Sequence, residues 1–408
     1  MDFSAVVLTE TQQAFAAELR ALLDEHLAGD PDARRRESSD DFDEGLYLAL
    51  GRKGWLWPRW RREDGGAELD EVCIRILETE LLNREAPVQG GAARLVWPAI
   101  EAFGNPGLAA ELKPQVALGT ARFTLGYSEP EGGSDIAGAK TQAVRDGDQW
   151  VINGQKMFTS NAQSANYTFL LTRTDPALPK HQGLTMFLVP LDSEGIERRP
   201  LATMGGWDNI IFYNDVRVPD RYRIGEVNNG WSVLRRPLDA EHHLGSQASK
   251  LADVSGGIHH MRYFEQSVQA AVCWALGAPA GDGSALISDP PFLAGIGRLL
   301  AEAEAGTVTP GPMGRVKGSD VAREGCEQLI DLVGPAAVLP YGAAGAISDG
   351  VIAFAHRQAQ QTATAGGSVE VFRTMIAQND LGLPRPDYPG RKGVTPSAPP
   401  AVRPSGRE

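Results

Sequence analysis

Two neighbouring segments of the chain read Tyr127-Ser128-Glu129-Pro130-Glu131-Gly132-Gly133-Ser134-Asp135-Ile136-Ala137-Gly138 and Trp150-Val151-Ile152-Asn153-Gly154-Gln155-Lys156-Met157-Phe158-Thr159-Ser160-Asn161. The first joins a predicted strand end to a glycine turn, where backbone N–H groups are free to face a ligand. The second places an aromatic ring beside two hydroxyl groups, which suits a planar ligand with hydrogen-bonding heteroatoms. A Gly-Gly-Ser loop alone is more often only a turn. Together the segments predict a ligand-binding loop and leave the ligand open.

Around these segments the sequence predicts an antiparallel β meander. Asp146-Gly147 and Asn153-Gly154 each lie between β-prone runs, and both dipeptides tolerate the positive φ angles of tight hairpin turns. Further extended segments are expected at residues 122–127, 167–172, 184–189 and 210–218.

Both flanks of this meander have helical periodicity. Thr9-Glu10-Thr11-Gln12 has the form of a capping box, and apolar residues at helical spacing follow it. Other helices are expected at 41–53, 69–83, 233–250, 254–277, 292–305, 319–332, 347–361 and 369–379. The sequence therefore predicts a mixed α+β chain with an N-terminal helical domain (1–120), a middle antiparallel β domain (121–229) and a C-terminal helical bundle (230–385). We expect the proline-rich tail, 386–408, to be disordered.

Composition excludes several classes of protein. The 408 residues carry 39 basic and 52 acidic side chains, a net charge of −13, which disfavours nucleic acid as a partner. We find no run of about 18 apolar residues and no signal-peptide pattern, so we expect a cytoplasmic protein with no membrane span. The three cysteines show neither disulfide nor zinc-ribbon spacing, and Cys73 is expected to be a buried apolar residue. We expect no metal site.

The two quoted segments resemble the signature of the acyl-CoA dehydrogenase family. The similarity runs over roughly residues 8–385, and shorter motifs support it: Gly54-Trp55, Gly65-Gly66, Gly230-Trp231, Gly366-Gly367-Ser368 with Arg373, and Leu381-Gly382-Leu383-Pro384-Arg385. The resemblance implies a helical, β and helical domain in that order. It also implies FAD held between the last two domains, with an acyl-CoA substrate against its ring.

By this resemblance, two groups of residues line the flavin. These are Tyr127, Ser128, Gly133 and Ser134 in the first segment and Phe158, Thr159 and Ser160 in the second. Phe158 stands where the family usually has Trp and keeps a stacking face. Ser160 stands where the family usually has Thr, with a hydroxyl that reaches toward flavin N5, and Ser128 replaces a frequent Thr.

The family reaction implied is α,β-dehydrogenation, in which a carboxylate takes the α proton and the β hydrogen leaves as hydride to flavin N5. The commonest position of that base is Gly366 here, which has no carboxylate, although its backbone N–H remains a donor to the thioester oxygen beside the flavin ribityl chain. Some members place the base on the first long helix of the last domain, in a context that Leu238-Asp239-Ala240-Glu241-His242 matches. The resemblance therefore implies Glu241 as the base, ahead of Asp239 and Glu370. Composition alone favours a solvated helix glutamate at position 241.

Departures from the family pattern bear on partners. Segment 261–266 lacks a glycine of the usual FAD-contacting motif, and 332–337 replaces a glycine-rich loop. These departures imply that FAD is shared with a paralogous subunit, as in heteromeric acyl-CoA dehydrogenases of steroid side chains, with a homo-oligomer as the alternative. The electron acceptor implied is an electron-transferring flavoprotein. A non-catalytic partner subunit and an oxygen-using oxidase or monooxygenase stay open as alternatives.

Overall fold

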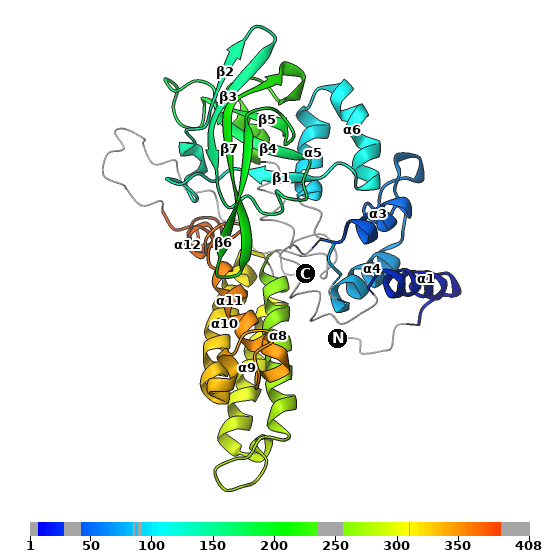
Figure 1. The fold of residues 1–408 in the computed structure, drawn as a ribbon, viewed down its shortest axis with the longest axis vertical. Helices are drawn as coiled ribbons and strands as arrows, with labels where there is room; N and C mark the ends of the chain where they lie inside the picture. The colour runs from blue at the N-terminus through cyan, green and yellow to red at the C-terminus, as the bar shows by residue number, and fades with distance from the viewer. Residues whose placement is uncertain are drawn as a thin grey trace. The chain divides into compact units, whose positions relative to one another are not determined.

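The computed structural model describes residues 7–27, 42–84, 86–88, 92–235, 256–309 and 311–384, drawn in colour in Figure 1. Contacts divide the chain into two compact units, one within Met1–Val254 and the other within Ser255–Glu408. The first unit contains helices followed by a β sheet, and the second is helical. The predicted α+β class and the order of helices, sheet and helices are confirmed.

Five α-helices precede the sheet in the described part of the first unit. They are α1 (Glu10–His26), α3 (Glu44–Arg52), α4 (Glu71–Asn83), α5 (Ala93–Phe103) and α6 (Pro106–Leu118). The predicted capping box begins α1, because the Thr9 hydroxyl accepts the Gln12 N–H while the Gln12 side chain accepts the Thr9 N–H. Cys73 lies in the apolar core of α1, α3 and α4, as expected.

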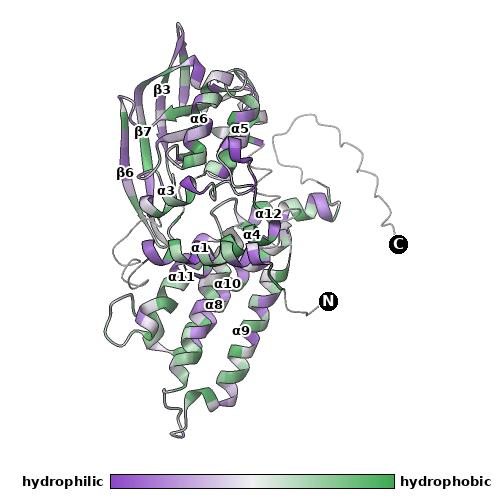
Figure 2. Ribbon diagram, turned by 90° about the vertical axis from the view of Figure 1, so that its right-hand side faces the viewer, coloured by the Kyte–Doolittle hydropathy of each residue, from purple (hydrophilic) through white to green (hydrophobic). Residues whose placement is uncertain are grey.

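Eight described strands form one sheet. They are β1 (Phe123–Gly126), β2 (Gln142–Asp146), β3 (Gln149–Lys156), β4 (Tyr167–Arg173), β5 (Leu184–Pro190), β6 (Ile196–Thr203), β7 (Gly206–Pro219) and β8 (Arg223–Ile224). Their order is β6-β7-β3-β2-β4-β5-β8, and β1 pairs in parallel with β4 beside this path (Figure 1). Strand β6, which the sequence pattern missed, forms one edge and is mostly hydrophilic in Figure 2.

The sheet is buried on both faces near its centre. Phe169 and Leu171 of β4 face the apolar side chains of α5 and α6, whereas Leu170 between them joins a core built from other strands. This alternation follows from the two-residue period of a strand. As a result, β4 and β5 give a rigid support to the loops at their ends.

One predicted hairpin is confirmed and the other is wrong. Gly147 has a φ of +65° in the two-residue turn between β2 and β3, where Asp146 pairs with Gln149. At Gly154, in contrast, β3 does not turn but continues to Lys156.

The Asn153-Gly154 pair marks a β-bulge instead of a turn. The register between β3 and β7 shifts by one residue between Ile152 and Gly154. Asn153 and Asp215 face each other there and exchange two hydrogen bonds of 2.9 Å, with Asp215 at a φ of +51°. This bulge has positive φ at Gly154 and Asp215, and tight hairpin turns also require positive φ, which is why the local sequence did not separate the two.

The second unit is built from helices around one apolar core. These are α8 (Gly256–Ala275), α9 (Pro290–Val308), α10 (Gly311–Val333), α11 (Val351–Gln361) and α12 (Val369–Met375), followed by a π-helical turn at Ile376–Asp380. Residues 230–235 are helical, whereas the rest of the predicted 233–250 helix and the 386–408 tail lie outside the described residues. None of the described helices combines the length and the apolarity that a bilayer crossing requires.

Candidate active site

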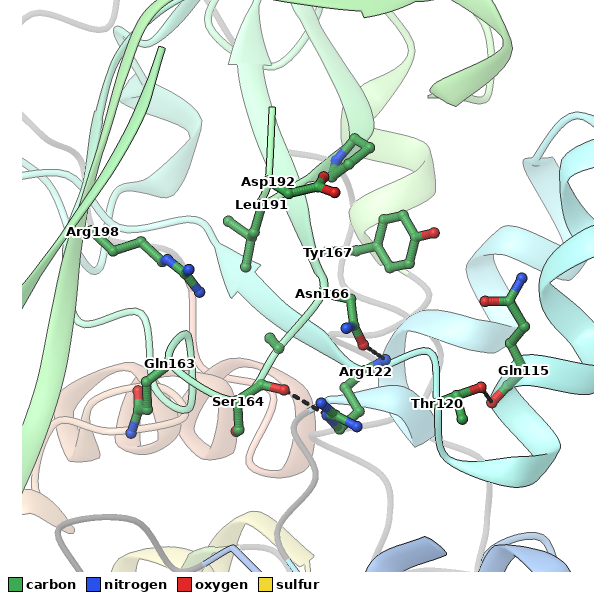
Figure 3. Close-up of a pocket in the computed structure, with 12 residues that line it drawn as sticks. Gln115, Thr120, Arg122, Gln163, Ser164, Asn166, Tyr167, Leu191, Asp192 and Arg198 are labelled. Carbon is green, nitrogen blue, oxygen red and sulfur yellow. Dashed lines mark hydrogen bonds between the residues drawn. The ribbon is translucent and has the colours of Figure 1, made fainter. Parts of the chain in front are cut away.

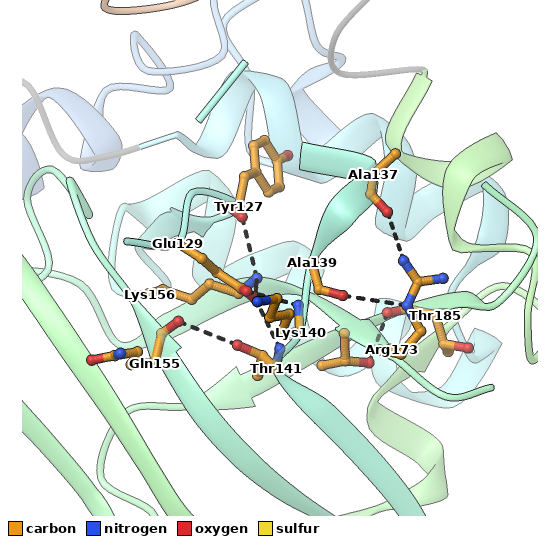
Figure 4. Close-up of polar contacts among 11 residues, drawn as sticks. Tyr127, Glu129, Ala137, Ala139, Lys140, Thr141, Gln155, Lys156, Arg173 and Thr185 are labelled. Carbon is orange, nitrogen blue, oxygen red and sulfur yellow. Dashed lines mark hydrogen bonds and ion pairs between the residues drawn. The ribbon is translucent and has the colours of Figure 1, made fainter. Parts of the chain in front are cut away.

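A buried ion pair anchors the first signature segment. Lys156 ends β3 with its side chain fully buried, and its Nζ lies 2.7 Å from Glu129 Oε1. The same ammonium donates to the Tyr127 carbonyl at 3.2 Å. The Glu129 carboxylate also accepts the backbone N–H groups of Lys140 and Thr141, at 2.7 and 2.9 Å (Figure 4). Since each of these contacts reaches a different part of the loop, the pair fixes the path of the whole segment.

Electrostatics keep this pair ionised at neutral pH. Burial lowers the pKa of Lys156 to about 8, and the neighbouring Glu129 charge partly offsets that effect. Burial acts to raise the pKa of Glu129, but Lys156 and the two backbone donors outweigh it and lower the pKa. The sequence interpretation missed this pair, although a lysine that ends a β-prone run needs a partner when it is buried.

A backbone hydrogen bond joins the two predicted segments. The Met157 N–H donates to the Ser128 carbonyl at 3.0 Å, directly beside the contact between Lys156 and Tyr127. The Tyr127 ring packs edge-on against Phe169 of β4, with 6.3 Å between ring centroids. Tyr127 and Ser128 are therefore held beside Lys156 and Met157 of the second segment.

The glycine turn of the first segment is open. Gly133 and Ser134 are both exposed. A Cβ atom placed on Gly133 would meet no atom within 4 Å. This part of the segment therefore leaves room beside its backbone for a ligand.

The second segment leaves the sheet after Lys156 and presents an aromatic ring. Phe158 is 55% exposed and has a φ of +55°, a conformation that non-glycine residues rarely adopt. Thr159 is fully buried, and its Oγ1 makes no hydrogen bond to any described residue. Ser160 donates its hydroxyl to Asp208 Oδ1 at 2.7 Å. A strained backbone beneath an outward aromatic ring is typical of a binding site. The Thr159 hydroxyl, in contrast, is buried beneath protein atoms and does not face a ligand in this structure.

Gly366 lies in the second unit, in the turn between α11 and α12. Gly366 and Gly367 have φ angles of +65° and +97°. Neither backbone N–H donates to another described residue, and Gly366 is exposed. Among the described residues, these two donors therefore have no acceptor.

The carboxylates considered as bases divide into two groups. Glu241 and Asp239 lie outside the described residues. Glu370 lies in the first turn of α12, where hydrogen bonds from its own backbone N–H and from Ser368 lower its pKa. A lowered pKa makes Glu370 a poor proton acceptor.

A separate polar cavity of about 430 Å³ lies in the first unit (Figure 3). Arg122 on its wall donates to the Ser164 carbonyl through Nε at 2.5 Å, and its backbone N–H donates to Asn166 Oδ1 at 2.9 Å. These bonds join the start of β1 to the loop before β4. None of the residues predicted to bind flavin or thioester lines this cavity.

Comparison with known proteins agrees with this architecture. Residues 9–120 match the N-terminal domain of acyl-CoA dehydrogenase, and residues 124–214 match its middle domain. Acyl-CoA dehydrogenase FadE26 of Mycobacterium tuberculosis is 33% identical over 359 residues, which cover 82% of this chain and 86% of the relative. Acyl-CoA dehydrogenase FadE29 of the same organism is 31% identical over 300 residues, covering 72% of this chain and 73% of the relative.

Solved structures show the same similarity. The ChsE4-ChsE5 complex from Mycobacterium tuberculosis contains a chain with a TM-score of 0.77 and 31% identity, covering 94% of this chain and 100% of that one. The Tcur3481-Tcur3483 steroid ACAD gives a TM-score of 0.73 with 29% identity, covering 95% and 100%. The chain therefore belongs to the acyl-CoA dehydrogenase family, whose members are flavoproteins.

Proposed function

We propose that the chain binds FAD through its two signature segments and dehydrogenates an acyl-CoA thioester between its α and β carbons. One observation supports this most strongly. The hydrogen-bonded pairing of the two segments leaves both the Phe158 ring and the Ser160 hydroxyl exposed. A planar, heteroatom-rich ring system can stack on the first group and form a hydrogen bond with the second.

The residues present fit a flavin. Phe158 supplies the stacking face, and the exposed Ser160 side-chain oxygen accepts a hydrogen bond. Ser160 keeps this capacity because its bond to Asp208 uses only its proton. Tyr127, Ser128, Gly133 and Ser134 provide backbone and side-chain donors from the first segment. When bound, FAD supplies the acceptor for the hydride that leaves the β carbon.

Two residues are assigned to the thioester end of the substrate, one as a hydrogen-bond donor and one as the base. The Gly366 N–H donates to the thioester oxygen, where negative charge develops as the α proton leaves. Glu241 takes that proton, because the more common position of the base is a glycine in this chain. The free Gly366 N–H within the described residues supports the first assignment. The match around residues 238–242 supports the second.

A partner-subunit role is the second candidate function. Both solved structures named above are two-protein complexes, ChsE4-ChsE5 and Tcur3481-Tcur3483. In this alternative the chain completes the FAD site of a paralogous subunit, and Glu241 does no chemistry.

Two experiments test these candidates. The chain is purified alone and after co-expression with a paralogue, and the flavin spectrum is recorded. A yellow protein only after co-expression supports a shared FAD site, whereas flavin bound by the chain alone supports a homo-oligomer. Glu241→Gln is then compared with the control Asp239→Asn. Loss of dehydrogenation in Glu241→Gln alone supports catalysis by this chain, and full activity in both variants supports the partner role.

The electron acceptor is tested separately. We expect reduced flavin to persist in air and to be reoxidised by an electron-transferring flavoprotein. Rapid reoxidation by oxygen alone would instead assign the chain to the oxidases or monooxygenases of this scaffold.

A further inference from the structure

Arg315 of α10 forms a hydrogen bond with the turn that contains Gly366. The residue is only 6% exposed, and its Nη2 donates to the Ala365 carbonyl oxygen at 2.6 Å. Its guanidinium carbon also lies 5.5 Å from the centre of the Phe372 ring on α12. A single buried cation therefore contacts both the peptide before Gly366 and the helix after it.

The geometry of the peptide unit links Arg315 to the Gly366 N–H. The Ala365 carbonyl and the Gly366 N–H belong to one planar peptide, and the described chain contains no cis peptide bond. In a trans peptide these two groups point in opposite directions. Because the carbonyl points toward buried Arg315, the Gly366 N–H must point away from α10, on the exposed side of the turn.

This orientation needs an external constraint. Rotation of the peptide between Ala365 and Gly366 changes mainly the ψ of the alanine and the φ of the glycine. Glycine adopts positive and negative φ almost equally well, so steric repulsion alone does not prevent such a flip. A flipped peptide would present a carbonyl oxygen in place of the N–H and would repel a thioester oxygen. Hydrogen bonds to a charged donor are among the stronger ones in proteins and hold one orientation.

Other contacts of α10 hold the ends of the turn. The Ser319 and Thr362 hydroxyls are 2.7 Å apart in a buried pair before the turn. Arg373 of α12 donates to Asp320 at 2.8 Å after it. These contacts fix where the turn begins and ends, but among the described residues it is Arg315 that bonds the Ala365 carbonyl.

We infer that Arg315 is a positioning residue, which holds the Ala365–Gly366 peptide in the orientation that directs the Gly366 N–H at the thioester oxygen. This inference rests on the proposed function. It predicts that loss of Arg315 removes recognition of the thioester carbonyl while binding of the remainder of the ligand persists.

The test compares two ligands that differ only in that carbonyl. Binding of octanoyl-CoA, a thioester, and of S-octyl-CoA, the matching thioether, is measured by anaerobic calorimetry on the flavin-containing full-length protein. The flavin is first reduced with dithionite, so that the thioester is not dehydrogenated during the titration. The variants are Arg315→Met, which keeps an unbranched apolar stem but removes the charged donor, and Arg315→Lys, which keeps one charged donor. The control is Lys317→Met on the same helix, because Lys317 pairs with Glu302 of α9 at the surface. Circular dichroism confirms that each variant folds.

We expect the wild type to prefer the thioester by about tenfold, the effect of one hydrogen bond. Arg315→Met should reduce that ratio to about one while its affinity for S-octyl-CoA stays within about twofold of the wild type. Lys317→Met should keep the full ratio. Arg315→Lys should give an intermediate ratio of about three, and it serves as the test if Arg315→Met does not fold.

Two different results would contradict the assignments. A full tenfold preference in the Arg315 variants overturns the positioning role and leaves the proposed function intact. No preference in the wild type overturns the proposed thioester site at Gly366, and the role of Arg315 falls with it.

Discussion

Lys156 Nζ lies 2.7 Å from Glu129 Oε1, and no part of the lysine side chain is exposed to solvent. Each residue belongs to one of the two signature segments, and 27 positions separate them in the chain. The ion pair therefore links the first segment, which contains the glycine turn, to the second segment, which carries the Phe158 ring. Loss of this ion pair should lower both the free energy of unfolding and the affinity for flavin.

Replacing Glu129 should be costly. Glu129→Gln leaves a buried ammonium without its counter-charge, and removal of one partner of a buried ion pair destabilises proteins by about 3 kcal/mol or more. Urea unfolding of the purified variant measures the loss.

Glu131→Gln is the matched control for this change. Glu131 lies two positions further along the same segment, and its ion pair with Lys140 is exposed, with both side chains about 70% accessible. A surface pair of this kind contributes at most about 1 kcal/mol. Equal losses in the two variants would show that burial of the Glu129 pair has no energetic importance.

Lys156 should make stability depend on alkaline pH. Burial lowers its pKa from 10.5 to about 8 in the folded protein. Between these two pH values the unfolded chain binds the proton more strongly than the folded one, so folding is penalised while Lys156 is charged and the penalty disappears as pH rises. The free energy of unfolding of the wild type should therefore rise relative to that of Lys156→Met from pH 8 to pH 10.5. A difference that is flat or falls over this range would contradict the lowered pKa.

Phe158 should affect flavin binding far more than folding. Its ring is 55% exposed, so Phe158→Ala should change the free energy of unfolding by less than about 0.5 kcal/mol. Loss of a stacking face should weaken FAD binding by about tenfold, and Phe158→Trp should preserve it. Fluorescence titration of the flavin-free protein measures both affinities. Val144→Ala, at a residue of β2 that is 61% exposed, is the control, and an equal effect there would remove Phe158 from the flavin site.

The bulge should tolerate no side chain at Gly154. A Cβ there would lie 2.7 Å from the Thr141 Cα, at a φ of +146°. Gly154→Ala should therefore cost about 3 kcal/mol. Gly147→Ala is the comparison, since Gly147 also has a positive φ but a Cβ added to it would meet no atom within 4 Å, and it should cost about 1 kcal/mol. Thermal unfolding of both variants is measured. A larger loss for Gly154→Ala shows that the close approach of two backbones matters, whereas equal losses indicate only the preference for glycine at positive φ.

Sequence patterns predicted the elements whose signals are local. The capping box at Thr9, the extended runs of β4 and β5 and the helical periodicity of the second unit all depend on residues within a few positions of each other. Helix α6 has no single apolar face that a sequence pattern could detect. Its apolar residues, among them Leu108, Leu112 and Leu118, lie around much of the helix, and Leu118 remains exposed. The local sequence also could not show whether Asn153-Gly154 forms a turn or a bulge, because both conformations found in this protein use positive φ.

The sequence by itself determined the family, the order of helices and sheet, and the two segments that carry the candidate flavin site. Only the tertiary structure decided which residues hold those segments in place. The Lys156–Glu129 pair spans 27 positions, and the Arg315–Ala365 hydrogen bond spans 50. Contacts between residues so far apart in the chain form only when the strands have paired and the helices have packed. They therefore depend on topology and packing, which no local sequence pattern encodes.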